Sequence, residues 1–435
     1  MTNSPNLMKS ALQAVNIDDE GRACQDIPES ACRQQGGNAL RHVTALGLSK
    51  SADGFVDPKL VLSWLLTTLG APVWMVGMLV PIRESGALLP QLFTAGYLRS
   101  LAKRKWAWSV GAAVQGLSAL GIILAGLLLK GALAGGAILA CLTCLSLARS
   151  VCSVSYKDVL GKTVDKQSRG SVTGLATSLS AGFVIVYALM LTTGLVDRMS
   201  LVLTGLCVAG AAWLAGSGVF LGLKEETGAT EGGRNAIEAA ISNLRFLKTN
   251  AQLRRFILTR GLLTATALAP PYMIAAASAD SETAYQSLGF LVLASAASSF
   301  LSSYVWGWLS DRSSRKVLIL SSLMGSVALL ATIGLYVTGL IETSYALPLV
   351  LFVLMIGYQG VRLGRSTHLV DMSDEDTRAA NTALSNTVIG VLLIFGSAFG
   401  LISSLFGVLT VLICFAVMCI LAIGAAWTLE EVQRT

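Results

Sequence analysis

Stretches of about 20 consecutive apolar residues recur along this chain, and each matches the length a helix needs to cross a membrane. Five of them are Ala107–Leu129, Leu201–Leu223, Val317–Leu340, Leu347–Gly357 with its flanks, and Val388–Trp427. A helix is a viable spanning structure because it bonds all its backbone polar groups internally. Charged residues make up only 13% of the chain, about half of what a soluble domain carries. The sequence therefore predicts an all-α polytopic membrane protein, and 435 residues leave room for about twelve spans.

A repeated pattern divides these spans into two halves. Gly96–Lys105 (GYLRSLAKRK) and Gly307–Lys316 (GWLSDRSSRK) each follow one apolar stretch and precede another, 211 residues apart. The sequences around Arg169 and Arg378 correspond at nearly the same offset, 209 residues. Internal repeats with a fixed offset are typical of secondary transporters. We therefore expect two pseudo-symmetric bundles of six helices each.

Residues 307–316 fit the pattern G-x-x-x-D-R-x-x-R-K, which resembles the signature loop of the major facilitator superfamily. The resemblance extends from residue 41 to about residue 427 and implies the twelve-helix fold and secondary transport activity of that family. It also implies that Asp311 caps and pairs across the cytoplasmic face, while the basic residues anchor the loop. The first copy departs from the pattern, because Ser100 stands at the aspartate position and Leu101 at the first arginine position. The cytoplasmic gate motif carried over comprises Gly96, Arg104, Lys105, Gly307, Asp311, Arg312, Arg315 and Lys316.

Polar segments set the expected domain boundaries. We expect an N-terminal tail at 1–40, a first bundle at 41–224, a linker with an amphipathic helix at 225–253, a second bundle at 254–428 and a C-terminal tail at 429–435. The linker helix is predicted to lie on the membrane surface, because its apolar residues repeat at helical spacing.

Basic residues are distributed unevenly between the two sides of the membrane. They gather in the connections after spans 2, 4 and 8, whereas only Lys130 and Arg198 fall in the short connections on the other side. Positive residues concentrate in cytoplasmic loops, so we expect both termini in the cytoplasm and the protein in the plasma (inner) membrane. The formal charge of +7 is thereby explained as a sign of topology, and nucleic acid is not expected as a partner.

The decapeptide KSADGFVDPK, residues 50–59, falls at the midplane of span 1 once the repeat sets the register. Hydropathy alone would begin span 1 at Leu60, leaving only the 13 residues GALLPQLFTAGYL for span 2. In the second half, the turn near Asp280 precedes Gly307 by about 27 residues. Counting the same distance back from Gly96 places the turn between spans 1 and 2 near residue 69. We therefore expect span 1 at roughly 41–69 and span 2 at roughly 72–98.

In span 7, Pro270 and Pro271 predict a break in the helix.

Six ionisable residues are therefore expected near the midplane of spans 1 and 2, namely Lys50, Asp53, Asp57, Lys59, Arg83 and Glu84. At 100° per residue Lys50, Asp53 and Asp57 share one helical face. Charges at this depth are costly and persist mainly beside a polar cavity or a partner. We predict that Asp53, Asp57 and Glu84 couple transport to protons, since a desolvated carboxyl group can exchange protons near physiological pH. A purely structural salt-bridge cluster is the alternative.

Cationic and polar residues near the midplane are candidates for binding the solute. The predicted substrate-binding residues are Lys50, Lys59, Arg83, Arg149, Tyr358, Gln359 and Arg362. Arg362 and Arg365 share a face of span 10 and could bind a carboxylate or phosphate bidentately. For Arg149 the alternative is snorkelling to the inner interface. The balance of cations predicts a small anionic or zwitterionic solute.

Other functions stay open on the sequence alone. A proton-driven drug exporter is one, although the span 5 sequence SLSAGFVIVYALML lacks the Gly-Pro pair of the family's antiporter signature. A metal exporter with Asp53, Asp57 and Glu84 as oxygen ligands is another, and a receptor that binds without transporting is a third. No P-loop, nucleophile elbow, haem motif or paired-histidine motif is present, so we expect no enzyme, cofactor or bound metal. The expected protein is a monomer whose partners are a small-molecule substrate, protons and the lipid bilayer.

Overall fold

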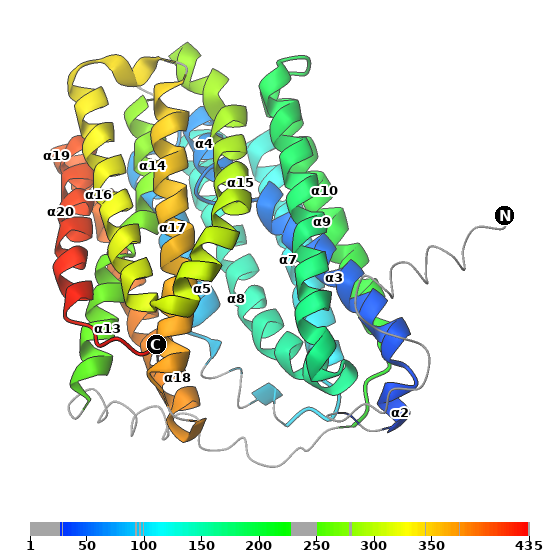
Figure 1. Ribbon diagram of the computed structural model, residues 1–435. Helices are drawn as coiled ribbons and strands as arrows, with labels where there is room; N and C mark the ends of the chain where they lie inside the picture. The colour runs from blue at the N-terminus through cyan, green and yellow to red at the C-terminus, as the bar shows by residue number, and fades with distance from the viewer. Residues whose placement is uncertain are drawn as a thin grey trace.

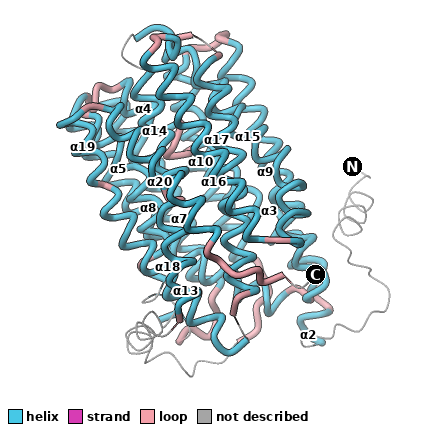
Figure 2. Tube along the Cα trace, turned by 60° about the vertical axis from the view of Figure 1, so that its left-hand side comes forward, coloured by secondary structure: helices cyan, strands magenta, loops and turns pink. Residues whose placement is uncertain are grey.

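The structure is a computed structural model that describes residues 29–91, 97–98, 100–227, 250–277, 281–343, 345–373 and 375–433, with residues 27 and 94. Within these ranges the regular elements are helices throughout, as the tube in Figure 2 shows. The chain is therefore all-α, as predicted. Most of the expected amphipathic linker helix, and Gly96 of the first gate-motif copy, lie outside the described residues.

The helices form two lobes that stand side by side in Figure 1. The first lobe contains α3 (Gln35–Phe55), α4 (Val61–Thr68), α5 (Val73–Leu88), α7 (Lys105–Leu128), α8 (Gly131–Thr163), α9 (Lys166–Thr193) and α10 (Arg198–Leu221), after the short α2 (Glu29–Cys32). The second contains α13 (Ala251–Leu262), α14 (Ala265–Ala277), α15 (Ser281–Arg312), α16 (Ser314–Val337), η1 (Leu340–Glu342), α17 (Ala346–Asp371), α18 (Glu375–Gly396), α19 (Ala398–Phe406) and α20 (Val408–Trp427).

Eight helical segments of the described chain are long and apolar enough to cross a membrane. They correspond to α7, α8, α9, α10, α16, α17, α18 joined to α19, and α20, and α15 is a ninth if its two halves, bent by 44°, count as one span. The other expected spans correspond to α3 with α4, to α5, and to α13 with α14. These are the segments that carry Lys50, Asp53, Arg83, Glu84 and Arg260. Charge coincides with a helix break in spans 1 and 7, and both features are typical of a site within the membrane.

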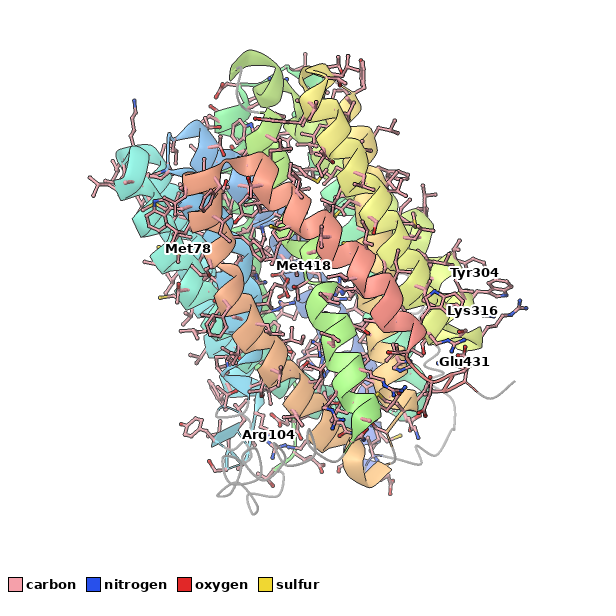
Figure 3. All side chains as sticks on the ribbon, turned by 90° about the vertical axis from the view of Figure 1, so that its left-hand side faces the viewer. Met78, Arg104, Tyr304, Lys316, Met418 and Glu431 are labelled. Carbon is pink, nitrogen blue, oxygen red and sulfur yellow. The ribbon has the colours of Figure 1, made fainter. Side chains whose placement is uncertain are left out.

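The outer surface of the helix bundle is rich in exposed apolar side chains. Leu128 is 77% exposed, Leu133 75% and Tyr304 82%, and Figure 3 shows Tyr304 projecting outward from the ribbon. Large side chains such as Trp213 and Tyr272 are instead at most 1% exposed inside the lobes. A protein in water rarely exposes apolar surface on this scale, so the chain is an integral membrane protein.

Two spans are interrupted within the molecule. α3 ends at Phe55 and α4 begins at Val61, so the decapeptide is helical in its first part and irregular around Pro58. In span 7 the break falls between α13 and α14, where the Thr264 hydroxyl donates to the Gly261 carbonyl at 2.6 Å. The predicted break at Pro270 and Pro271 is wrong, because both prolines lie inside α14.

The two lobes pack closely at the end of the bundle opposite to the C-terminus and α2 (Figure 1). A Cβ added to Gly400 on α19 would lie 2.7 Å from the carbonyl oxygen of Trp74 on α5. One added to Gly289 on α15 would lie 2.5 Å from the backbone nitrogen of Thr192 on α9. Only glycine permits such an approach of two backbones. We call this the closed end, and we call the end that carries the gate motifs the basic end.

Candidate functional site

Asp53 on α3 holds two arginines from different helices. Its carboxylate lies 2.6 Å from a guanidinium nitrogen of Arg83 on α5 and 2.7 Å from one of Arg149 on α8. The three side chains are between 14% and 27% exposed. Hydrogen bonds between charged groups are short and strong, so this ion triad ties three predicted site residues and three spans together. Arg149 therefore points into the lobe, and the snorkelling alternative does not describe it.

Polar contacts extend the ion triad toward α9 and α10. The hydroxyl of Ser49 accepts hydrogen bonds from Arg149 and from the Trp213 indole nitrogen, both at 3.2 Å. The ammonium of Lys50 donates to the hydroxyl of Thr177 on α9 at 2.6 Å. Lys50 also lies within electrostatic range of Arg362 on α17. This side of the first lobe thus presents cations toward the second lobe.

Asp57 lies in the break of span 1 and contacts backbone. Its Oδ1 accepts hydrogen bonds from the N–H groups of Lys59 at 2.7 Å and Leu60 at 3.1 Å. The carboxylate thus caps the turn that precedes α4, in the manner of an aspartate turn, whereas the start of α4 itself has no side-chain cap. Because α3 ends at Phe55, Asp57 does not continue the face of α3 that carries Asp53, contrary to the predicted alignment. Pro58, which follows Asp57, cannot donate a backbone hydrogen bond, and a helix seldom continues through it.

Lys59 reaches from the first lobe to the second. Its ammonium lies 3.6 Å from the centre of the Tyr358 ring on α17, and the residue is only 8% exposed. A desolvated cation over an aromatic face is stabilised by about 2 kcal/mol. Asp57 and Glu84 lie within electrostatic range of the same ammonium. Two predicted site residues from different lobes, Lys59 and Tyr358, are therefore in direct contact.

A cavity of about 30 Å³ lies between the lobes next to this contact. Its volume holds one or two water molecules. Glu84 and Leu88 of α5 line one side, and the second lobe lines the rest. The charged and polar side chains around it are Glu84, Arg260, Thr264, Tyr358, Arg362 and Arg365. Among the described residues, none of the three arginines has a carboxylate within ion-pair distance.

Arg260 on α13 is a site residue that the sequence analysis missed. It is 6% exposed, and its guanidinium donates to the Ser385 hydroxyl at 2.7 Å and to the Asn386 side-chain oxygen at 3.0 Å. Its Nε is buried, and no described residue accepts a hydrogen bond from it. The signal that identifies it is the one used for Asp53, an ionisable residue within a span. The expected start of the second bundle, at residue 254, already placed Arg260 inside that span.

Not every predicted residue belongs to the cavity. Gln359 is half-buried on α17 and does not line it. Asp53, Asp57 and Glu84 do not come together as ligands, since the described chain contains no group of three acidic, histidine or cysteine side chains able to hold a metal ion.

The first gate-motif copy is held by carboxylates from other helices. Glu225, just after α10, accepts hydrogen bonds from the backbone N–H groups of Arg104 at 3.0 Å and Lys105 at 2.8 Å. Arg104, labelled at the basic end in Figure 3, also pairs with Asp158 on α8. These two acidic residues supply the negative charge that the loop lacks at Ser100. Carboxylates therefore hold this loop of the N-terminal lobe in place, although its sequence departs from the pattern.

The second gate-motif copy is tied to the C-terminal segment. The hydroxyl of Ser313 caps α16 by accepting from the Lys316 N–H at 3.1 Å, and it donates to Glu431 at 2.6 Å. Glu431 also lies 3.7 Å from Arg315, and Figure 3 shows it near Lys316. Asp311, for which the resemblance implied the capping role, is exposed. A serine beside the helix start thus replaces the aspartate as the cap.

The remaining residues of this loop make local contacts. The Arg312 guanidinium lies 3.8 Å from the centre of the Trp308 ring, which holds the side chain along the end of α15. Gly307 is half-buried within the same helix.

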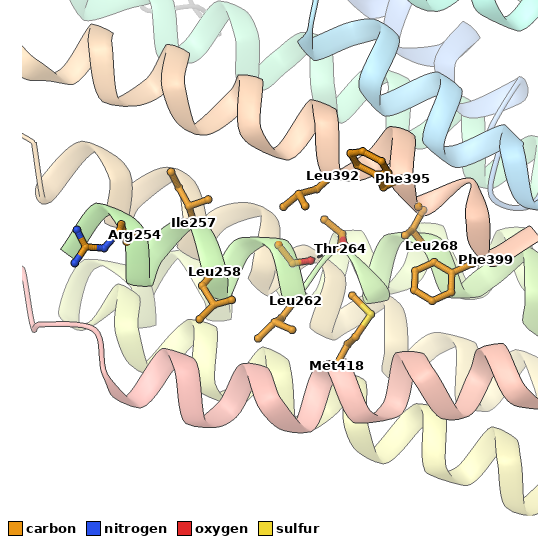
Figure 4. A pocket seen from close by; sticks show the side chains of 12 residues that line it. Arg254, Ile257, Leu258, Leu262, Thr264, Leu268, Leu392, Phe395, Phe399 and Met418 are labelled. Carbon is orange, nitrogen blue, oxygen red and sulfur yellow. Dashed lines mark hydrogen bonds between the residues drawn. The ribbon is translucent and has the colours of Figure 1, made fainter. Parts of the chain in front are cut away.

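A larger cavity of about 580 Å³ lies on the second lobe alone. Figure 4 shows that its walls, from α13, α14, α18, α19 and α20, are almost wholly apolar. Arg254 and Thr264 are its polar lining residues. A site for a polar solute needs several convergent polar groups, so the small inter-lobe cavity, and not this groove, is the candidate functional site.

Comparisons with known proteins agree with this architecture. Residues 256–435 match the family model described as Major Facilitator Superfamily. No curated protein sequence matches the chain. The crystal structure of the nucleoside transporter NupG superposes with a TM-score of 0.66 at 13% identity, covering 90% of this chain and 99% of that one. A mutant of the same transporter gives 0.69 at 13% identity, over 89% and 98% of the two chains. The D-xylose-proton symporter gives 0.67 at 12% identity, over 91% and 98%.

Proposed function

We propose that this chain is a member of the major facilitator superfamily, whose family model matches residues 256–435, and that it moves a small anionic solute across the membrane. Transport is secondary and proceeds by alternating access. The solute binds between the two lobes and is coupled to protons through a midplane carboxylate. At 12–13% identity the solutes of the structural neighbours do not transfer, so the proposal rests on the charges of this chain.

The observation that carries this proposal is the excess of cations around the inter-lobe space. Seven cationic side chains surround it, namely Lys50, Lys59, Arg83, Arg149, Arg260, Arg362 and Arg365. Three carboxylates, Asp53, Asp57 and Glu84, offset them and leave a formal charge of +4. Uncompensated charge at this depth is unfavourable, and an anionic solute supplies the missing compensation.

Glu84 is the carboxylate best placed to carry the coupling proton. Asp53 is engaged by two guanidinium groups and Asp57 by two backbone N–H groups. Glu84 lines the cavity, and no described cation lies within ion-pair distance of its carboxylate. Proton transfer at Asp53 or Asp57 would have to break those contacts first. One of the structural neighbours is a proton symporter, which makes proton coupling the natural mechanism to test.

Alternating access requires each lobe to move as a unit. The ion pairs at the basic end lie within single lobes, from Arg104 to Asp158 and from Arg315 to Glu431. The glycine contacts at the closed end join one lobe to the other. With both termini in the cytoplasm, as the loop charges predict, this arrangement corresponds to an inward-facing state of a monomer in the plasma membrane.

The purified protein should be screened against a metabolite library by thermal shift at two pH values. We expect stabilising solutes to be predominantly anionic and to lose their effect on the double variant Arg362→Gln, Arg365→Gln. The best solute should then be taken up by proteoliposomes. Stabilisation by neutral or cationic solutes alone, unaffected by the double variant, would overturn the anion assignment. Binding without uptake would indicate a receptor.

A further inference from the structure

Three guanidinium groups of the second lobe face one carboxylate of the first. Arg260, Arg362 and Arg365 line the cavity together with Glu84. Their charges sum to +2, because three cations stand against one anion. Arg362 and Arg365 lie one helical turn apart on α17, so both side chains leave the same face. Forked guanidinium groups in such an arrangement suit an oxyanion that accepts several hydrogen bonds at once.

Arg260 gives this cluster its fixed geometry. Ser385 and Asn386 hold two of its nitrogens at 2.7 and 3.0 Å, while its buried Nε has no hydrogen-bond partner among the residues that the structure describes. A buried guanidinium that has neutral partners and an unused N–H is poorly compensated. The hydroxyl and the amide therefore orient the cation without neutralising it, which leaves its charge for a ligand in the cavity.

Glu84 occupies the position of a competing anion. Within the described part of the chain, the charged groups that face it are cations: Lys59 from the break of span 1, Arg83 from α5, Arg260 from α13, and Arg362 and Arg365 from α17. Tyr358 borders the same cavity. A volume of about 30 Å³ admits water but not a second oxyanion group beside the carboxylate. A solute must therefore displace Glu84 or the lobes must separate.

We propose that the transported solute carries a dianionic oxyanion function, which binds Arg260, Arg362 and Arg365 in competition with the ionised carboxylate of Glu84. This inference rests on the proposed transport function and names the chemistry of its solute. When Glu84 is protonated, the three guanidinium groups carry +3, of which a dianion compensates two charges and a monoanion only one. Protonation of Glu84 removes the competitor, so proton binding and anion binding favour one another by thermodynamic linkage.

Sulfate is the probe that tests this proposal, because it remains divalent from acidic to alkaline pH. Its binding to the purified full-length protein should be followed by thermal shift against chloride at equal ionic strength. We expect the apparent affinity of the wild type to rise as pH falls. Glu84→Gln should bind sulfate about tenfold more tightly than the wild type at high pH and show little pH dependence. The same binding measurement with phenyl phosphate and with succinate shows whether the site prefers a phosphomonoester or a dicarboxylate.

Matched variants separate the site from general salt effects. Arg365→Lys keeps the positive charge but removes the planar guanidinium that can bind an oxyanion through two N–H groups. It should weaken sulfate binding about tenfold. Lys130→Gln, which removes an exposed charge far from the cavity, should leave it unchanged. The proposal is overturned if Glu84→Gln gains no affinity for any of the three dianions. It is also overturned if Arg365→Lys and Lys130→Gln have the same affinity for sulfate. Uptake of a monoanionic solute that depends on Arg362 would overturn this inference and leave the proposed anion transport intact.

Discussion

Asp53 is the residue on which the charge arrangement of the first lobe depends. It is the common partner of Arg83 and Arg149, so its loss leaves two guanidinium groups in a poorly hydrated place. Removing one member of a buried ion pair is far more costly than replacing the whole pair, because the partner stays behind uncompensated.

Asp53→Asn should therefore lower the stability of the protein by about 3 kcal/mol and abolish uptake. Thermal unfolding in detergent measures the first effect and proteoliposome uptake the second. Asp197→Asn is the control, since Asp197 caps α10 by accepting from the Ser200 N–H at 2.9 Å and asparagine caps equally well. Equal stability of the two variants would contradict the role assigned to Asp53.

Asp57 provides a different test, because the cap and the charge can be separated. Asp57→Asn keeps an oxygen acceptor for the N–H groups of Lys59 and Leu60, whereas Asp57→Ala removes it. We expect the alanine variant to lose about 1 kcal/mol of stability and the asparagine variant to match the wild type in thermal unfolding. If both variants are equally destabilised, the cap assignment is wrong. Uptake by the stable asparagine variant then tests the proton-coupling role predicted for Asp57.

The sequence was informative about individual residues where helical geometry holds without interruption. Asp53 and Arg83 were predicted as site residues from their depth in the spans, and they meet Arg149 in one ion triad. Asp57 departs from the helical face because the chain leaves the helix before Pro58, and period-based reasoning assumes a continuous helix. Arg260 was overlooked although it lies inside a predicted span, and packing brings it beside Arg365 and Glu84.

At the scale of helices, acidic residues at equivalent positions in the two lobes bind the two gate loops. Glu225 follows α10 and holds the start of α7, while Glu431 follows α20 and holds the start of α16. The two positions are 206 residues apart, close to the offset of the sequence repeat. The repeat predicted equivalent loops, but not these carboxylates, because they lie outside both matching segments.

Glu431→Gln should release the start of α16 and reduce protection of that helix end. We expect faster hydrogen exchange at residues 313–318, since the helix loses a charged partner for Ser313 and Arg315. Glu430→Gln is the matched control, because the neighbouring carboxylate is exposed at the surface. Equal exchange in the two variants would show that the C-terminal segment does not hold the loop.

At the scale of the whole molecule, the lobes meet through glycine at the closed end and through Lys59 and Tyr358 beside the cavity. The apolar spans and the repeat predicted this two-lobe fold, which follows from patterns that extend over many residues. Which end is closed could not be predicted, because the same sequence must adopt both states during transport.

Gly400→Leu should keep α19 from packing against the Trp74 backbone. The two lobes should then separate more readily at the closed end. Inserting a large side chain into a tight contact costs about 1–3 kcal/mol, so the α5 start and α19 should exchange hydrogen faster. Gly424→Leu is the control, since no atom lies within 4 Å of a Cβ added there. Unchanged exchange in Gly400→Leu would contradict the proposed closure.

Uptake of the best anionic solute into proteoliposomes under an imposed proton gradient tests the account most directly. The wild type should accumulate the solute faster when the outside is acidic, Glu84→Gln should transport it without regard to the gradient, and the double variant Arg362→Gln, Arg365→Gln should not transport it at all. Full uptake by the arginine double variant, with its proton dependence intact, would show that the charged cavity between the lobes is not the transport site.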